Sequence, residues 1–419
     1  MKRNKVMRLI ALVAVAALSI CMLAACSGDS KKTDSSTNGS SSSTSSNLAN
    51  VKVGLICLHD ENSTYDLNFI NSLEAAKKSL GLSDDQVIIK KNVPESNDCK
   101  EAAFDLADHG CTIIFADSFG HEPYLIEAAD KYPNVQFCHA TGTMAHTEKK
   151  SNFHNAFASI YEGRYLAGIA AGMKLNEMIN SGKITAEQAV IGYVGAYTYA
   201  EVISGYTSFF LGVRSVCPSA TMKVQFTGSW YDETAEKEAA TKLISSGCVL
   251  ISQHADSMGA PTACENANVP NVSYNGSTKD ACPNTFIVSS RIDWAPYYEY
   301  AIKAAAEGKT IDYDWVGSIS TNSVLLTEVN EQAAAAGTQD AINKAIEDLK
   351  AGKVHVFDTA KFTVGGKTLD SYKADVDTDD NYTPDTEVIK DGYFHESEFR
   401  AAPYFDLRID GIETLNEMY

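Results

Sequence analysis

The sequence predicts an α/β fold of two Rossmann-like lobes, each built on a parallel central sheet and joined by a hinge. Dense apolar runs alternate with segments of helical periodicity, and two such series follow one another along the chain. The segments LADHGCTIIFADS, ending at Ser118, and LISSGCVLISQHADS, ending at Ser257, occupy equivalent places in the two series. With 419 residues and 44% hydrophobic composition, the chain can bury two sizeable cores.

The first series begins with residues 51–58, an apolar run too dense for a half-exposed strand and too short for a helix. This pattern favours a central strand that is covered on both faces. From Tyr65 the period becomes helical as far as Leu80, and Gly81 is a plausible stop. Residues 59–66 therefore lie between a strand end and a helix start, which is where open α/β sheets bind ligands.

The other elements of the two series follow in order. In the first series we expect strands at residues 87–89, 111–116 and 135–139, and helices at 98–108, 121–131 and 157–173. In the second series we expect strands at 190–194, 222–226, 248–252 and 269–274, and helices at 200–216 and 233–246. Because both series end their strands in polar loops, the loops of the two lobes are expected to face one cleft.

The last third of the chain is expected to complete both lobes. Helices are predicted at residues 294–307 and 332–350, and strands at 313–319, 354–357 and 361–364, before a polar loop. The expected division assigns residues 51–187 and about 290–320 to lobe 1, and 188–289 and about 321–419 to lobe 2. The sequence Asp375-x-Asp377-x-Asp379 lacks the glycine and the glutamate of a calcium loop, so it predicts a solvated acidic turn.

The N-terminus has the pattern of an export signal. Four basic residues within positions 1–8 precede an apolar run at 9–22, which is too short to be a confident membrane span. Leu23-Ala24-Ala25-Cys26 resembles a bacterial lipobox, which makes Cys26 the expected lipidated residue; the alternative is an ordinary signal peptide with an incidental cysteine. Residues 1–25 are then the signal peptide. The serine-rich residues 26–50 are expected to tether the protein to the outer face of the cell membrane.

Net charge argues against one class of partner, and the cysteine pattern argues against disulfides and a metal site. The formal net charge is −19, and loss of the signal would make the chain more acidic still, which argues against a nucleic-acid partner. An exported chain permits disulfides. However, several cysteines lie inside apolar strands, which favours free buried thiols, and no CxxC pair predicts a metal site. The eight cysteines after Cys26 are Cys57, Cys99, Cys111, Cys138, Cys217, Cys248, Cys264 and Cys282.

Several motifs together resemble the basic membrane protein family, across roughly residues 51–308. They are STYDLNFINSL, YEGRYLAGIAAG, IGYVGAY, TGSWYDETAEKEAATKLISSG and SSRIDWAPYY, in addition to the Cys26 signal. Members of this family are lipoprotein substrate-binding components of ABC importers and are related to purine nucleoside receptors. The resemblance implies a type I periplasmic-binding-protein-like fold, and a membrane-anchored protein that delivers its ligand to ABC permease subunits.

The resemblance also implies a binding mode, in which a purine ring lies between one aromatic side chain from each lobe. Tyr65 and Trp230 match these positions and Asp66 matches the polar one; core packing is the alternative for the aromatics. The family's charged ribose-binding positions correspond here to Asn275, to the vicinity of Ile292 and to Thr141. A free base or another flat heterocycle is therefore as well supported as a nucleoside.

Further candidates lie in the two matching exit loops. Ser118 and Phe119 follow a first-series strand, and His254 and Asp256 follow its counterpart, so all four are candidate ligand contacts. Trp294 is a candidate contact or a core residue. His59-Asp60-Glu61 is the one cluster that resembles acid–base machinery, but no nucleophile elbow, HExxH motif or phosphate-binding loop accompanies it. No catalytic residue, cofactor or metal is therefore expected.

The functional prediction is a binding protein that closes two lobes over a purine nucleoside or free purine base and presents the closed form to a permease. An extracytoplasmic sensor of the same fold is the first alternative. A nucleoside-processing enzyme is the second.

Overall fold

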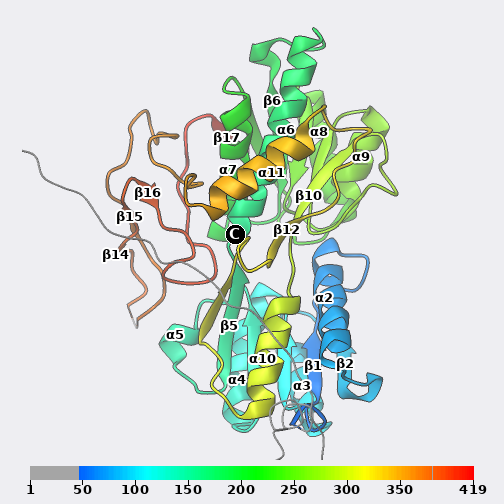
Figure 1. Ribbon diagram of the computed structural model, residues 1–419, viewed down its shortest axis with the longest axis vertical. Coiled ribbons are helices and arrows are strands. Elements are labelled where there is room, and N and C mark those ends of the chain that lie inside the picture. The colour runs from blue at the N-terminus through cyan, green and yellow to red at the C-terminus, as the bar shows by residue number, and fades with distance from the viewer. Residues whose placement is uncertain (1–46, 380) are drawn as a thin grey trace, which may run out of the picture. The chain divides into compact units, whose positions relative to one another are not determined.

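Two parallel-dominated sheets carry the fold in the computed structural model, which describes residues 47–379 and 381–419. The first sheet has the order β11-β5-β4-β3-β1-β2, and all its pairings are parallel (Figure 1). Its strands are β1 (Val53–Ile56), β2 (Val87–Lys90), β3 (Ile113–Ala116), β4 (Gln136–Ala140), β5 (Phe153–Ala158) and β11 (Asp314–Gly317). Cys26 and its signal, with most of the tether, lie outside the described residues.

The second sheet has the order β12-β10-β9-β8-β6-β7-β17, and β12 alone runs antiparallel to its neighbour within the described residues. Its strands are β6 (Val190–Gly195), β7 (Thr221–Phe226), β8 (Leu250–Gln253), β9 (Asn271–Tyr274), β10 (Phe286–Ile292), β12 (Val324–Leu326) and β17 (Ile412–Thr414). The predicted fold class, two α/β lobes with parallel sheets, is confirmed. We call the elements around the first and second sheets the first and second lobe.

Amphipathic helices cover the first sheet, namely α2 (Thr64–Leu80), α3 (Asn97–Asp108), α4 (Glu122–Lys131) and α10 (Ala295–Glu307). The α2 helix ends at Gly81, whose φ of 70° is the left-handed conformation that glycine adopts without strain. The α2 and α10 helices lie side by side (Figure 1). The rings of Phe69 and Trp294 stack between them with centroids 4.4 Å apart.

The long helix α6 (Ile160–Asn180) packs against α7 (Ala200–Val216) at backbone contact distance. A Cβ atom on Gly168 would lie 2.1 Å from the Phe209 carbonyl oxygen, so only glycine permits this approach. The small residues of the YEGRYLAGIAAG motif therefore set the spacing of the two helices. The other helices of the second lobe are α8 (Glu233–Ser245), α9 (Gly259–Ala267) and α11 (Thr338–Lys350).

Short elements complete the chain. These short elements are α5 (Ala145–Glu148), three 3₁₀ turns (Asp84–Gln86, Phe119–His121, Ala186–Gln188) and β13 to β16 (Lys373–Ala374, Thr386–Glu387, Ile389–Lys390, Tyr393–Phe394).

The structure corrects the sequence predictions for residues 332–364. The helix predicted at residues 332–350 begins only at Thr338, because Gly337 adopts a φ of 78° just before it. Residues 354–357 and 361–364 form no strands. Their apolar side chains instead pack in an aromatic cluster, where Phe357 stacks on Phe405 with centroids 4.3 Å apart.

The chain after α11 returns to both lobes. We call residues 357–419 the C-terminal segment, drawn in orange to red in Figure 1. Its last strand, β17, pairs with β7 and extends the second sheet. Its residue Ala401 is fully buried in the apolar cluster of the first lobe, and the Ala401 N–H donates to Asp314 of β11 at 2.6 Å.

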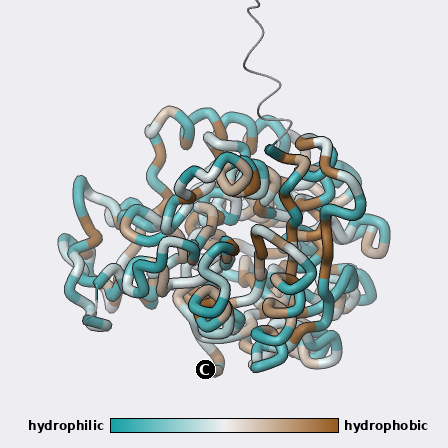
Figure 2. Tube along the Cα trace, turned by 90° about the horizontal axis from the view of Figure 1, so that it is seen from below, coloured by the Kyte–Doolittle hydropathy of each residue, from teal (hydrophilic) through white to brown (hydrophobic). Residues whose placement is uncertain are grey.

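The interior of the fold is apolar, and hydrophobic stretches of the trace alternate with hydrophilic turns (Figure 2). All eight described cysteines are buried and unpaired, which confirms the preference for free buried thiols over disulfides. No helix in the described part of the chain combines the length and apolarity that crossing a membrane requires.

Candidate functional site

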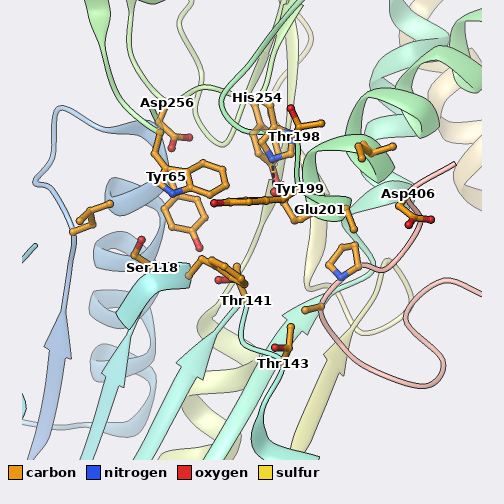
Figure 3. A pocket seen from close by; sticks show the side chains of 18 of the residues that line it. Tyr65, Ser118, Thr141, Thr143, Thr198, Tyr199, Glu201, His254, Asp256 and Asp406 are labelled. Carbon is orange, nitrogen blue, oxygen red and sulfur yellow. Dashed lines mark hydrogen bonds and ion pairs between the residues drawn. The ribbon is translucent and has the colours of Figure 1, made fainter. Parts of the chain in front are cut away.

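A cavity of about 410 Å³ is lined by side chains of both lobes, most of them at the carboxyl ends of strands (Figure 3). The first lobe contributes Leu58, His59, Tyr65, Asp66, Ser118, Phe119, Thr141 and Thr143. The second lobe contributes Thr198, Tyr199, Ala200, Glu201, Ile203, Trp230, His254, Asp256 and Tyr274. Seven of the nine ligand contacts predicted from the sequence are therefore brought together, namely Tyr65, Asp66, Ser118, Phe119, Trp230, His254 and Asp256.

Tyr65 lies in the first turn of α2, which begins at Thr64, one residue before the start of the helical period in the sequence. The helix begins early because Ser63 caps it: the Ser63 hydroxyl accepts a hydrogen bond from the Asp66 N–H at 3.2 Å. The Tyr65 hydroxyl donates to the Asp117 carbonyl oxygen at 2.7 Å. The Tyr65 ring is thereby held at both ends, by the helix and by this hydrogen bond, with a face available to the cavity.

Two buried carboxyl groups, those of Asp66 and Asp117, lie close to Tyr65. Asp66 is 1% exposed, and its Oδ1 accepts from the His59 N–H at 2.8 Å. Burial alone would raise the pKa of Asp66, but the hydrogen bonds from His59 and its other neighbours hold that pKa below its usual value. Burial, and secondarily the Asp66 charge, raise the pKa of Asp117. The surroundings therefore favour the ionised form of Asp66 and the protonated form of Asp117.

The Cys57 thiol completes a cluster with Asp66 and Asp117, in which one ligand atom of each lies within 4.8 Å of the others. These donor types can hold a metal ion. However, burial raises the pKa of Cys57, which favours the thiol over the metal-binding thiolate. Oδ2 of Asp66 and Oδ2 of Asp117 have no other hydrogen-bond partner among the described residues, which fits a proton shared between the two carboxyl groups.

His254 is held as a neutral ring at the second-lobe wall of the cavity. Its Nε2 lies 2.7 Å from Glu201 (Figure 3). Its Nδ1 lies 3.3 Å from the Tyr193 hydroxyl. Burial lowers the pKa of His254, so Nε2–H donates to Glu201 while Nδ1 accepts from Tyr193. The neighbouring Arg164 of α6 is fully buried; burial lowers its pKa to about 10, which leaves it charged at neutral pH.

Asp256 connects three loops at the edge of the cavity. Its N–H donates to the Trp230 carbonyl at 3.0 Å, and its own carbonyl accepts from both the N–H and the hydroxyl of Thr64 at 3.1 Å. The Asp256 Oδ1 accepts from the Asn275 amide at 3.3 Å. Burial raises the pKa of Asp256 well above its usual value, which favours the protonated form of its side chain, and that form can donate a hydrogen bond.

The structure does not bring the two remaining predicted residues to the cavity. Asn275 is buried behind Asp256 and supports it through the hydrogen bond above. Trp294 is 1% exposed and packs between Phe69 and Phe157 in the core of the first lobe. The indole of Trp294 therefore stabilises the lobe and does not line the cavity.

Sequence reasoning missed Tyr199, whose ring lies between the two lobes. Its centroid is 5.5 Å from that of Phe119 in the first lobe and 6.1 Å from that of Trp230. Tyr199 directly precedes α7, in the loop that follows β6. That loop is the second-lobe counterpart of the loop that leads to Tyr65. Comparing the two series position by position would therefore have identified Tyr199 as a candidate ligand contact.

Sequence reasoning also missed the C-terminal segment, which supplies part of the wall. Its lining residues are Asp377, Arg400, Ala402, Pro403, Asp406 and Tyr419. The prediction of a solvated acidic turn is wrong for Asp377, because its Oδ2 pairs with Nη1 of the buried Arg400 at 2.6 Å. The irregular backbone there has no period from which such a contact is predictable.

Two parallel-sheet lobes with one cavity at their carboxyl edges define a two-lobed solute-binding protein. The chain belongs to the family of PnrA-like ABC transporter substrate-binding proteins, whose family model matches residues 53–356. The resemblance to the basic membrane protein family is thereby confirmed.

Individual relatives are similar over part of their length. The chain is 32% identical over 259 residues to a Haloferax volcanii protein named "Putative ABC transporter glucose-binding protein TsgA13", covering 60% of this chain and 62% of that one. It is 32% identical over 218 residues to a purine-binding protein of Brucella abortus, covering 52% and 58%. The chain thus spans about three fifths of the length of these two relatives.

Solved structures share the fold at low sequence identity. An ABC transporter solute-binding protein from Aeropyrum pernix has a TM-score of 0.62 at 15% identity, covering 73% of this chain and 93% of that one. One from Conexibacter woesei has a TM-score of 0.59 at 18% identity, covering 73% and 98%. Both are binding proteins by their names, and the likeness concerns the fold.

Proposed function

We propose that this substrate-binding protein captures a purine base or purine nucleoside between its lobes and delivers it to the permease of an ABC importer. The observation that carries the proposal is that Tyr65 and Trp230, from different lobes, line one cavity. An aromatic face stacks on any base, at about 1–3 kcal/mol per base. The similarity to a purine-binding protein supports the same ligand class.

Polar groups beside the aromatic side chains match the edge of a purine. In its favoured ionised form Asp66 accepts from a ring or exocyclic N–H, whereas in its favoured protonated form Asp256 donates to a ring nitrogen. Both side chains line the cavity and are almost fully buried. A sugar offers hydroxyl groups but no flat ring with such an edge, so this combination favours a heterocycle.

Ligand capture proceeds by a population shift between an open and a closed arrangement of the lobes. A ligand that contacts both lobes binds the closed state more tightly and therefore raises its population. The proposed role is binding, without bond cleavage. A sensor would use the same closure, and a permease and ATPase encoded beside this chain would favour transport.

The test is to identify the compound that the gently purified protein retains, by mass spectrometry, and to titrate the emptied protein with adenine, adenosine and glucose. We expect a purine to be retained and the purines to bind in preference to glucose. Retention of a sugar or an amino acid would overturn the proposed ligand. Incubation with adenosine should release no free adenine, and steady release would instead identify an enzyme.

We also propose that Cys26 is lipidated and holds the protein on the outer face of the cell membrane, where substrate-binding proteins of ABC importers work. The proposal rests on the sequence Leu23-Ala24-Ala25-Cys26 after a short apolar run. The Cys26→Ser variant should move from the membrane fraction to the soluble extracytoplasmic fraction. A variant that stays with the membrane would contradict lipidation at this residue.

A further inference from the structure

We infer that Glu162 is a positioning residue of the connection between the lobes: its carboxylate holds the turn at residues 318–323 against α6, and the charge on that carboxylate favours the closed arrangement. The inference requires that the two lobes open and close, and it is independent of which ligand they enclose. It gives the connection a side chain that titrates, so closure itself depends on pH.

Three crossovers connect the lobes in the described part of the chain, and we call them the hinge. They are Ser159 between β5 and α6, residues 293–294 between β10 and α10, and residues 318–323 between β11 and β12. The third crossover is joined to each of the others. The Ser159 N–H donates to the Gly317 carbonyl at 2.8 Å, and the Asp293 N–H donates to the Ser323 carbonyl at 2.8 Å.

The Glu162 side chain reaches across this hinge. Its Oε2 accepts from the Ile319 N–H at 2.8 Å, and no other charged side chain of the described residues hydrogen-bonds to the backbone of residues 318–323. Ile319 lies two residues after β11 of the first lobe. Glu162 lies in the first turn of α6, where a Cβ atom on Gly163 would lie 2.9 Å from Val324 of the second sheet. Rotation of one lobe against the other therefore moves Ile319 relative to Glu162.

The turn at residues 318–323 is compact and has space beside it. The Ser323 and Val324 N–H groups both donate to the Ser318 carbonyl, at 3.0 and 3.2 Å, so the turn shifts as a unit. A cavity of about 320 Å³ lies between the turn and α11, and its lining includes Ile319 and Val324. The turn is thus not packed tightly on this side, and its attachment to α6 rests on Glu162.

The Glu162 carboxyl group titrates near neutral pH. Burial raises the pKa of Glu162 to about 7, against the opposing effects of the Ile319 N–H and of Lys350, the charged group of α11 that faces it. The turn has no titratable side chain, and burial raises the pKa of the neighbouring Tyr161, which stays neutral. A charged carboxylate accepts a hydrogen bond about twice as strong as a neutral group accepts, so deprotonation strengthens the contact with Ile319.

The sign of the pH effect follows from the arrangement of the lobes. They are joined here by the hydrogen bond from Thr64 to Asp256, in the same structure in which Ile319 contacts Glu162. Losing the Ile319 contact on opening removes a group that lowers the pKa of Glu162, so this pKa is higher in the open arrangement. The open arrangement binds the proton more tightly, and the closed one gains population as the pH rises through about 7.

The test measures lobe separation by single-molecule energy transfer between two dyes in the ligand-free protein, at pH 6, 7 and 8. The dyes are attached to Lys78→Cys in α2 and Glu238→Cys in α8, at positions that are exposed on different lobes. The eight described native cysteines are buried, so the labels go to the introduced thiols. Without ligand, the outcome does not depend on purine binding.

Three variants separate the charge of Glu162 from a merely structural role. Glu162→Gln keeps an acceptor for the Ile319 N–H and cannot ionise. Lys350→Met removes the facing cation at an exposed position and leaves the hydrogen bond in place. Glu177→Gln is the matched control, because Glu177 is an exposed glutamate near the other end of the same helix.

We expect the ratio of closed to open molecules to rise about fivefold between pH 6 and pH 8 in the unsubstituted protein, since the charged hydrogen bond is the stronger one. Glu162→Gln should show the lower ratio at every pH, Lys350→Met should shift the midpoint to higher pH, and the control should follow the unsubstituted protein. A ratio with the same pH dependence in Glu162→Gln, or an unshifted midpoint in Lys350→Met, would overturn the inference.

Discussion

The backbone N–H of Thr64 donates to the carbonyl oxygen of Asp256 at 3.1 Å, which joins the first residue of α2 to the loop after β8. The Thr64 hydroxyl donates to the same oxygen at 3.1 Å. These hydrogen bonds connect the two lobes beside Tyr65 and Asp66. They would help to stabilise the proposed closed state beside the cavity, and the first prediction concerns this contact.

Replacing Thr64 with proline should weaken ligand binding by disfavouring the closed state. Proline is accepted at the first position of a helix, and the extended Ser63 before it (φ −78°, ψ 126°) suits a following proline. The ring removes both hydrogen bonds and places a carbon where the N–H pointed at Asp256. We expect a loss of about 1 kcal/mol or more in calorimetric titration with a purine. The Thr64→Ala variant, which keeps the N–H, should lose less; equal losses would contradict a role for the backbone contact.

The second prediction concerns the two stacking side chains. Tyr65→Ala and Trp230→Ala should each weaken purine binding by roughly 1–3 kcal/mol, because each removes one aromatic face. Tyr65→Phe should retain most of the affinity, since it loses only the hydrogen bond to the Asp117 carbonyl. The control is Tyr382→Ala, at a residue that is 57% exposed and does not line the cavity. Unchanged affinity in both alanine variants would reject the aromatic pair as the binding site.

The positions of Tyr65, Trp230, His254 and Asp256 were predictable for one physical reason. Parallel strands end at the same edge of a sheet, so polar loops that follow dense apolar runs converge there. The fold class was predictable for the same reason, because those runs and the helices between them are periodic. Tyr199 satisfied the same rule and would have been found by applying it to every strand.

Three features were not predictable, because they depend on tertiary contacts without a local sequence pattern. They are the burial of Trp294, the position of Arg400 in the cavity wall and the lack of a strand at residues 354–357. Trp294 precedes a helix, and whether such a ring turns to the cleft or the core depends on its neighbours; here Phe69 and Phe157 surround it. Arg400 reaches the wall from an irregular segment. Residues 354–357 have the composition of a strand, yet no neighbouring strand pairs with them among the described residues.

The third prediction concerns the cysteines. All eight described thiols are buried, and burial raises the pKa of Cys57 and Cys99, so both accessibility and thiolate content are low. A chromogenic disulfide reagent at pH 8 should therefore label none of these eight in the folded protein and all eight after unfolding in guanidinium chloride. Fewer than eight reactive thiols in denaturant without reductant would show disulfides instead. Rapid labelling before unfolding would contradict burial.

The last prediction concerns Glu396 in the C-terminal segment. Its Oε1 accepts from the Tyr404 N–H at 3.1 Å, but its Oε2 has no hydrogen-bond partner among the described residues. Burial raises the pKa of Glu396 to about 8, against an ordinary value of 4.5. Between these two values the folded protein holds a proton that the unfolded chain has released. The free energy of unfolding therefore falls as the pH rises through this window.

Replacing Glu396 with glutamine should remove this contribution, because the amide keeps an acceptor for Tyr404 and does not titrate. The slope of unfolding free energy against pH, measured by denaturant titration between pH 5 and 8, should flatten by up to about 1.4 kcal/mol per pH unit relative to the unsubstituted protein. The variant should accordingly be the more stable of the two at pH 8. Glu413→Gln, at an exposed position of the same segment, should leave the slope unchanged. An unaltered slope in Glu396→Gln would mean that Glu396 is already ionised in the folded protein, with its charge compensated by Arg400.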